Sequence, residues 1–168
     1  MASGIAVWTI GHSNHDPARF LELLECHSIE LVVDVRSAPF SRYVPHFNRE
    51  SIAGSLRHAG MQYLYMGKAL GGKREPPMSF LQIAETQAFQ ARVRQLAELA
   101  ARRKTVIMCG EENPARCHRR MLITPALQRL GVEVLHIRGD GRVLTDDEVE
   151  QEATGGQASL DFDSPGAG

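Results

Sequence analysis

The sequence predicts an α/β fold: a single three-layer α/β/α domain built on a mainly parallel sheet of about five strands. Apolar runs alternate along the chain with segments of helical periodicity, and this alternation is typical of parallel strands joined by right-handed crossovers. The run at residues 31–35 is nearly all apolar and β-branched, as expected of a strand covered on both faces. The chain has 168 residues, the usual length of one domain.

The first predicted strand, residues 5–10, is a short apolar run that ends at Gly11. Asp16 is placed to cap the helix that follows, and Pro17 suits the first position of that helix. The run at 31–35 is the second strand. Together these segments form the first strand–helix–strand unit of the predicted sheet.

The middle of the chain contains a short helix and a third strand between two loops. Residues 36–48 are rich in Pro, Ser and Arg and predict a long loop. Asn48 is placed to cap the next helix, which Gly60 ends. A weaker strand at 62–66 follows, and then a second loop at 67–79.

The second half continues the alternation. Apolar residues at helical spacing predict a long helix over roughly 86–103, followed by a strand at 105–108. Asn113 stands before a proline and predicts the start of the next helix. Pro125 lies inside that helix and should kink or restart it. A fifth strand at 132–137 completes the sheet.

The charges divide the chain into a basic body and an acidic end. We expect the folded domain to span 1–152, with a short helix near 145–152, and residues 153–168 to form a disordered tail. Residues 1–142 contain 19 basic and 13 acidic side chains, a net charge of +6, and the other seven acids follow. A basic body attracts phosphate-bearing partners, although scattered surface charges would give the same balance.

The cellular location is expected to be cytoplasmic. Three cysteines at these spacings do not indicate a disulfide framework. The N-terminus lacks the pattern of a signal peptide, and no apolar run approaches the ~20 residues of a membrane span. We therefore expect no membrane partner, and no feature of the sequence predicts an oligomeric state.

Polar and basic residues follow four of the predicted strands. Ligands of open parallel sheets bind outside the carboxyl ends of the strands, so we expect these loops to converge on one site. The predicted substrate-binding residues are His12, Ser13, Arg36, Ser41, Arg42, Asn48, Gly71, Gly72, Arg116 and Arg119.

The arginines in this set predict an anionic ligand. Guanidinium groups form charge-assisted hydrogen bonds with phosphate or carboxylate, and a helix that starts at Asn113 would add its unpaired N–H groups. The alternative is structural, because the same arginines could pair with Asp34, Glu111 and Glu112.

Four residues are predicted to be catalytic: Asp34, Cys109, Glu111 and His118. Asp34 or Glu111 would act as an acid or base, and His118 or His12 could take the same role. Each of these groups could instead be structural, since a histidine or carboxylate at a strand end often satisfies a local hydrogen bond.

Cys109 ends a strand and is expected to face the start of the next helix. That environment would lower the pKa of the thiol and allow it to act as a nucleophile, in an arrangement similar to that of rhodaneses and cysteine phosphatases. Six residues separate Cys109 from Arg116, one more than in those loops, and Glu111 and Glu112 disfavour a thiolate. The alternative is a small buried thiol with a structural role.

A site that binds zinc or iron is the alternative to a site without metal. Cys109, Cys117 and His118, with His12 from another loop, have the ligand types that these metals prefer. The Cys-x7-Cys-His spacing is not a standard zinc spacing, however. On a regular helix the side chains of Cys117 and His118 would diverge by about 100°, which argues against one shared site. We therefore predict no metal site and no cofactor.

Several short motifs occur in a specific order along the chain. They are Thr9-Ile10-Gly11-His12-Ser13, Asp34-Val35-Arg36, Pro39 with Ser41-Arg42, Phe47-Asn48, Leu70-Gly71-Gly72, and Cys109-x-Glu111 with Cys117-His118-Arg119. Over about residues 5–138 they closely resemble the family called domain of unknown function 488. The resemblance implies that these loops form one site, and it does not choose between an enzyme and a binding protein.

The sequence therefore indicates an enzyme that acts on or binds a phosphate-bearing small molecule or nucleotide. A nucleic-acid-binding protein is the first alternative, indicated by the basic body and the basic loops at 36–49 and 68–74. A metal-binding domain that uses cysteine and histidine is the second. Aromatic residues make up only 6% of the chain, which counts against a broad base-stacking surface.

Overall fold

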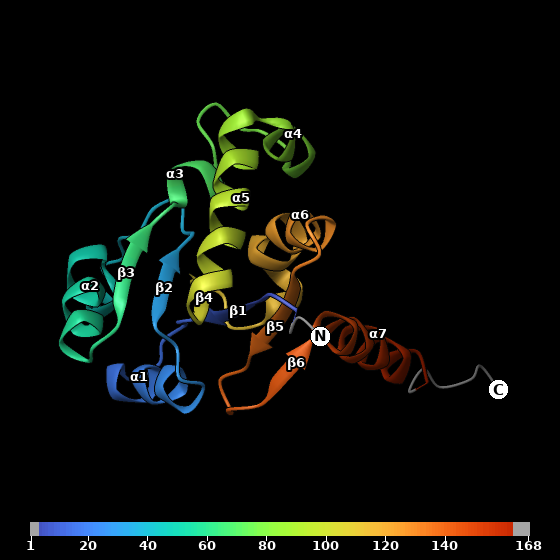
Figure 1. The fold of residues 1–168 in the computed structure, drawn as a ribbon. Helices are drawn as coiled ribbons and strands as arrows, with labels where there is room; N and C mark the ends of the chain where they lie inside the picture. The colour runs from blue at the N-terminus through green and yellow to red at the C-terminus, as the bar shows by residue number, and fades with distance from the viewer. Residues whose placement is uncertain (1–3, 163–168) are drawn as a thin grey trace.

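A computed structural model describes residues 4–162 of the chain, and the side chains of residues 4–155. Its centre is a six-stranded sheet with the order β3-β2-β4-β1-β5-β6 (Figure 1). The strands are β1 (Ala6–Gly11), β2 (Leu31–Asp34), β3 (Gln62–Tyr65), β4 (Thr105–Cys109), β5 (Glu133–Ile137) and β6 (Val143–Thr145). The first five are parallel, and β6 is antiparallel to β5. The predicted α/β class is confirmed, and β6 is an addition to the five expected strands.

The strand order positions the loops. β2, β4 and β1 are neighbours, and their last residues are in register: Gly11 lies opposite Cys109, and Asp34 lies opposite Met108. The pairing continues beyond the strands, because the backbone N–H of His12 donates to Cys109 O at 2.8 Å. The segments that follow these three strands therefore emerge side by side at the carboxyl edge of the sheet.

Helices cover both faces of the sheet, as expected of the three-layer fold (Figure 1). The helices α1 (Pro17–Cys26) and α2 (Arg49–His58) pack on one face. The helices on the other face are α3 (Gly67–Leu70), α4 (Phe80–Glu85), α5 (Gln87–Arg102) and α6 (Thr124–Arg129). Adjacent strand residues point to opposite faces of the sheet. Val32 packs under α1 and α2, and Val33 packs under the helices α3 to α6 of the other face.

The capping predictions had different outcomes. Asp16 caps α1 as predicted, with its Oδ1 accepting from Ala18 N at 2.8 Å. Asn48 does precede α2, but its side chain does not cap the helix. Its Oδ1 accepts from Ser41 N at 2.7 Å instead, and so folds the loop after β2 back on itself. The predicted N-cap position of Asn48 is therefore confirmed, but the expected capping hydrogen bond is absent because the loop uses the same side chain.

The predicted loops and helices also differ in detail from the structure. The loop at 36–48 contains the 3₁₀ turn η1 (Pro45–Phe47), and the loop at 67–79 contains α3. The expected helix over 86–103 is α5, and α4 precedes it as a separate short helix. Ser79 begins α4 with a complete capping box, and Thr86 caps α5 in turn.

The segment after β4 is not the single helix that was predicted. It consists of the 3₁₀ turn η2 (Pro114–Arg116), the π-helix η3 (Arg119–Ile123) and α6. Pro125 stands in the first turn of α6, so the predicted restart at this proline is confirmed. The break before Arg119 was not predicted, and it determines the geometry of the site.

The acidic end of the chain forms α7 (Asp146–Phe162). This helix is longer than the one expected near 145–152, and it occupies the first ten residues of the segment expected to be a tail. The rest of that segment, 163–168, lies outside the described residues. Within the described part of the chain, every helix is too short or too polar to cross a membrane.

Candidate functional site

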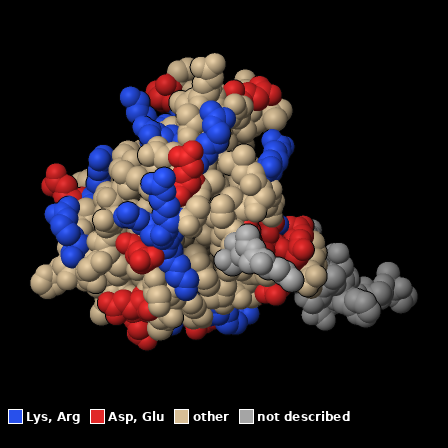
Figure 2. All heavy atoms as spheres, viewed as in Figure 1, with Lys and Arg blue, Asp and Glu red and all other residues tan. Residues whose placement is uncertain are grey.

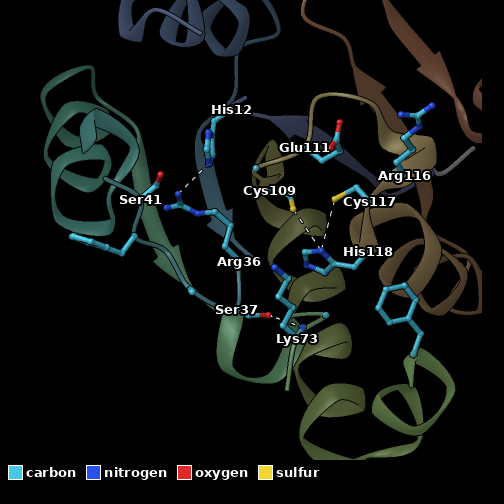
Figure 3. Close-up of a pocket in the computed structure, with 15 residues that line it drawn as sticks. His12, Arg36, Ser37, Ser41, Lys73, Cys109, Glu111, Arg116, Cys117 and His118 are labelled. Atoms are coloured by element: carbon cyan, nitrogen blue, oxygen red, sulfur yellow. Dashed lines mark hydrogen bonds between the residues drawn. The ribbon is translucent and has the colours of Figure 1, made fainter. Parts of the chain in front are cut away.

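A cavity of about 470 Å³ opens at the carboxyl edge of the sheet, between the loops that follow β1, β2, β3 and β4 (Figure 3). The predicted convergence of these loops is therefore observed. Eight predicted site residues line the cavity: His12, Arg36, Ser41, Gly72, Cys109, Glu111, Arg116 and His118. The lining also contains Cys117, which the sequence analysis considered only as a metal ligand, and residues that it did not select: Ser37, Ala38, Phe40, Lys73, Phe80 and Gly110.

Arg36 is held in place by Asp34, the last residue of β2. Asp34 Oδ1 accepts from Arg36 Nε at 2.9 Å, and Oδ2 accepts from Nη2 at 2.8 Å. The Tyr63 hydroxyl donates to the same Oδ2 at 2.6 Å. Burial alone would lower the pKa of Arg36, but the hydrogen bonds and charge of Asp34 raise it. Asp34 is fully buried behind the arginine, so it acts as a positioning residue and does not line the cavity.

His12 contacts Arg36 from the loop after β1. Its Nδ1 lies 2.8 Å from the Ser13 carbonyl oxygen, which can only accept, so Nδ1 carries the proton. Its Nε2 is then an acceptor for Arg36 Nη1 at 3.2 Å, and the ring stacks on Phe47. Burial lowers the pKa of His12 to about 4, and the neighbouring Arg36 charge acts in the same direction. His12 is therefore a neutral base with its lone pair directed at the arginine.

Cys109, Cys117 and His118 form a compact cluster in one wall of the cavity (Figure 3). His118 Nδ1 lies 3.5 Å from Cys109 Sγ and 3.8 Å from Cys117 Sγ. All three ligand atoms lie within 4.8 Å of one another, so this group, found among the described residues, could hold a metal. The prediction that Cys117 and His118 diverge was wrong. Cys117 has an extended backbone (φ −117°, ψ 144°) after the η2 turn, so the helical angle of 100° does not apply.

The structure also corrects the environment predicted for Cys109. No regular helix begins at Asn113, because η2 is a single turn of three residues. The pKa of the Cys109 thiol is raised, first by its hydrogen bond with Cys117 and then by burial. The hydrogen bond with Cys109 and the contact with His118 lower the pKa of Cys117. If one of the two thiols ionises, the favoured one is Cys117.

Arg119 is a structural residue, although it was predicted to bind substrate. Its side chain is fully buried and does not line the cavity. It donates to the carbonyl oxygens of Glu111 and Glu112, and to Thr9 Oγ1 at 3.2 Å. Glu112 is turned outward to Arg138 at 3.0 Å. Of the two glutamates in this loop, only Glu111 lines the cavity.

The other predicted residues do not line the cavity. Arg42 points to the Tyr43 ring, 5.8 Å from its centroid. Ser13 adopts a positive φ of 45° at the turn after β1. Gly71 packs so tightly that an added Cβ would lie 2.3 Å from Ser37 Oγ. Asn48, as described, orders the loop through Ser41.

Lys73 and Phe40 were the main residues that the prediction missed. Lys73 directly follows the Gly71-Gly72 pair, and its backbone N–H donates to Ser37 Oγ at 2.9 Å. Its position after that glycine pair was a signal that could have identified it. Phe40 is 74% exposed, and an exposed phenylalanine cannot be distinguished from a core one by sequence alone.

The fold and the site together define an α/β domain with an arginine- and thiol-lined cavity at the carboxyl edge of its sheet. Over residues 16–124 the chain matches the family described as Domain of unknown function DUF488, and the chain belongs to this family. The match includes the loops after β2, β3 and β4, which form most of the cavity. Comparisons with curated proteins and with solved structures find no significant match.

Proposed function

We propose that the cavity is the active site of an enzyme that binds a phosphate-bearing small molecule, of which a nucleotide fits the lining best. The position of Arg36 carries this proposal. Ligands of open parallel sheets bind at this edge, and an arginine fixed before the ligand arrives loses little side-chain freedom on binding.

The hydrogen bonds of Arg36 leave part of its guanidinium group available. An arginine has five N–H donors, and the contacts with Asp34 and His12 use one each on Nε, Nη2 and Nη1. The two remaining donors can bind phosphate oxygens in the planar geometry that guanidinium groups favour.

Two further cations supply the charge that a phosphate needs, since Asp34 already balances Arg36. Lys73 and Arg116 line the same cavity, and neither is in an ion pair among the described side chains. Glu111 is the only acid in the lining, so the cavity has a net positive charge.

Aromatic rings in the lining favour a nucleotide over a bare phosphate. Phe40 is exposed at the cavity, and Phe80, the first residue of α4, also lies in the lining. An exposed ring beside a phosphate-binding group offers a surface on which a base can stack, which is worth roughly 1–3 kcal/mol per base.

The test is calorimetric titration of the protein with nucleoside monophosphates and with inorganic phosphate. We expect measurable binding, and we expect the Arg36→Gln variant to bind at least about tenfold more weakly. Arg42→Gln is the matched control, because Arg42 comes from the same loop and lies outside the lining. It should bind like the unmodified protein.

Arg36→Gln leaves Asp34 without its main partner and could reduce stability. Lys73→Ala and Arg116→Gln therefore provide a second test at exposed positions. If no titrant binds, or if the cavity variants and Arg42→Gln bind alike, the proposal fails.

A further inference from the structure

We propose that Cys109, Cys117 and His118 bind one zinc ion, with the fourth coordination position open to the cavity. This inference goes beyond the proposed function, because metal binding does not require a nucleotide. Two thiols and one imidazole are a ligand set that zinc prefers, and three protein ligands with one open position are typical of catalytic rather than structural zinc sites.

The separations between ligand atoms match those of a metal site. Zinc–sulfur and zinc–nitrogen bonds of about 2.3 and 2.05 Å at the tetrahedral angle place sulfur and nitrogen about 3.6 Å apart. The observed distances from His118 Nδ1 are 3.5 Å to Cys109 Sγ and 3.8 Å to Cys117 Sγ. One ion can therefore contact the three atoms with only small side-chain movements.

The protonation of His118 gives an independent argument. Its Nε2 lies 2.9 Å from the Val35 carbonyl oxygen, which can only accept, so Nε2 carries a proton. Nδ1, the atom that faces both sulfurs, is then the ring nitrogen available to bind a metal. Metal-binding histidines almost always donate their other N–H to a carbonyl or carboxylate, and this bond orients the ring.

The backbone holds the ligands in place without a metal. Cys109 ends β4, in the centre of the sheet, and the η2 turn returns the chain so that Cys117 faces it. Arg119 ties the intervening loop down through the carbonyl oxygens of Glu111 and Glu112. Both cysteines are free and buried, so neither is already used in a disulfide.

The open side of the cluster faces the cavity. All three ligand residues contribute to the same lining as Arg36 and His12. In Figure 3 the side chains of Cys109, Cys117 and His118 point toward one another from one wall, and Arg36 lies across the cavity. A metal-bound water or a ligand oxygen can occupy the fourth position from that side.

The experiment uses the full chain purified without a histidine tag. Elemental analysis should find one zinc per chain. After removal with a chelator, titration with Co²⁺ should produce the thiolate-to-cobalt charge-transfer absorption and the visible bands of a tetrahedral site. Cys109→Ser, Cys117→Ser and His118→Gln should each lose or strongly weaken that absorption, with folding checked by circular dichroism.

Cys26→Ser is the matched control, because Cys26 is also a free cysteine but lies exposed at the end of α1. It should bind cobalt like the unmodified protein. The proposal is overturned if the folded protein shows no thiolate–cobalt absorption. It is also overturned if Cys26→Ser loses this absorption as fully as the three ligand variants do. A Cys109–Cys117 disulfide in protein purified under reducing conditions would overturn it as well. These titrations contain no nucleotide, so their failure is distinguishable from failure of the proposed function.

Discussion

At the scale of single residues, the site shows how one side-chain type takes different roles. Arg36 is fixed by Asp34, lines the cavity and keeps two N–H donors that its contacts with Asp34 and His12 do not use. Arg119 uses the same guanidinium chemistry to hold backbone carbonyl oxygens and is fully buried. Both arginines use one donor on each of Nε, Nη1 and Nη2, so the difference lies in their positions: Arg36 lines the cavity, whereas Arg119 is buried against the loop and the strand residue that it holds.

Two buried histidines predict how stability depends on pH. Burial lowers the pKa of His12 and of His136 to about 4 from the usual 6.5. Between pH 4 and pH 6.5 these two histidines therefore bind more protons in the unfolded chain than in the folded protein. The free energy of unfolding should therefore fall as the pH decreases from 6.5 toward 4, by on the order of 3 kcal/mol for each histidine. Urea unfolding across this pH range measures the slope.

His136→Gln isolates one of the two contributions. The His136 ring bridges Thr9 Oγ1 at 2.7 Å and Asp146 Oδ1 at 3.1 Å, and a glutamine amide can form similar hydrogen bonds but does not titrate. The variant should lose stability less steeply on acidification. An unchanged slope would show that His136 does not protonate on unfolding in this range.

At the scale of elements, the segment after β4 is the decisive part of the molecule. Its 3₁₀ turn, π-helix and α-helix replace one regular helix, and the extended Cys117 between them brings the two cysteines together. In η3 the backbone N–H of Thr124 donates to Arg119 O, five residues earlier, and the Thr124 hydroxyl donates to the same oxygen at 2.8 Å. Pi-helical turns of this kind often occur at functional sites.

Arg119 connects this segment to the sheet, so its replacement should destabilise the protein. Arg119→Lys keeps the charge but cannot reach Thr9, Glu111 and Glu112 together, and we expect a loss of roughly 3 kcal/mol. Arg120→Lys is the control at the adjacent position, where the partly exposed ion pairs with Asp146 and Glu150 are worth at most about 1 kcal/mol. Urea unfolding should separate the two variants, and equal losses would contradict the role given to Arg119.

At the scale of the whole molecule, the acidic end of the chain neutralises part of the basic body. Side chains of α7 form ion pairs with three arginines of the body. The pairs are Arg120–Asp146 at 2.9 Å, Arg120–Glu150 at 2.6 Å, Arg138–Glu152 at 2.5 Å and Arg142–Glu152 at 3.4 Å. On the face shown in Figure 2, basic side chains are interspersed with acidic ones. The net charge of +6 on residues 1–142 is therefore not gathered into one surface on this face.

The ion pairs of α7 with Arg120, Arg138 and Arg142 predict weak interaction with nucleic acid. A labelled oligonucleotide should show no steep loss of binding between about 50 and 200 mM salt, because few phosphate contacts can form at once. Fluorescence anisotropy at several salt concentrations measures this dependence. A decrease of about a thousandfold or more would instead indicate many phosphate contacts and support the nucleic-acid alternative.

The sequence predicted most of the fold, because its signals are local. Apolar runs located β1, β2 and β4, and Asp16 and Pro17 marked the start of α1. The convergence of the loops could be predicted because parallel strands all end at the same edge of the sheet. The short elements η2 and η3 could not be predicted, since they depend on packing against the sheet. Neither could β6, a strand of three residues that forms only by pairing with β5.

The sequence by itself therefore determined the α/β class, the order of the elements and the set of polar loops at one edge of the sheet. Only the tertiary structure decided which of those polar residues face the cavity. Arg36, Arg42 and Arg119 are equivalent in sequence terms, yet one lines the cavity, one lies outside it and one is buried. Likewise, Cys117 and His118 meet Cys109 only because the chain is extended at Cys117. The physical reason is that side-chain direction depends on local backbone angles and on contacts between residues far apart in the sequence.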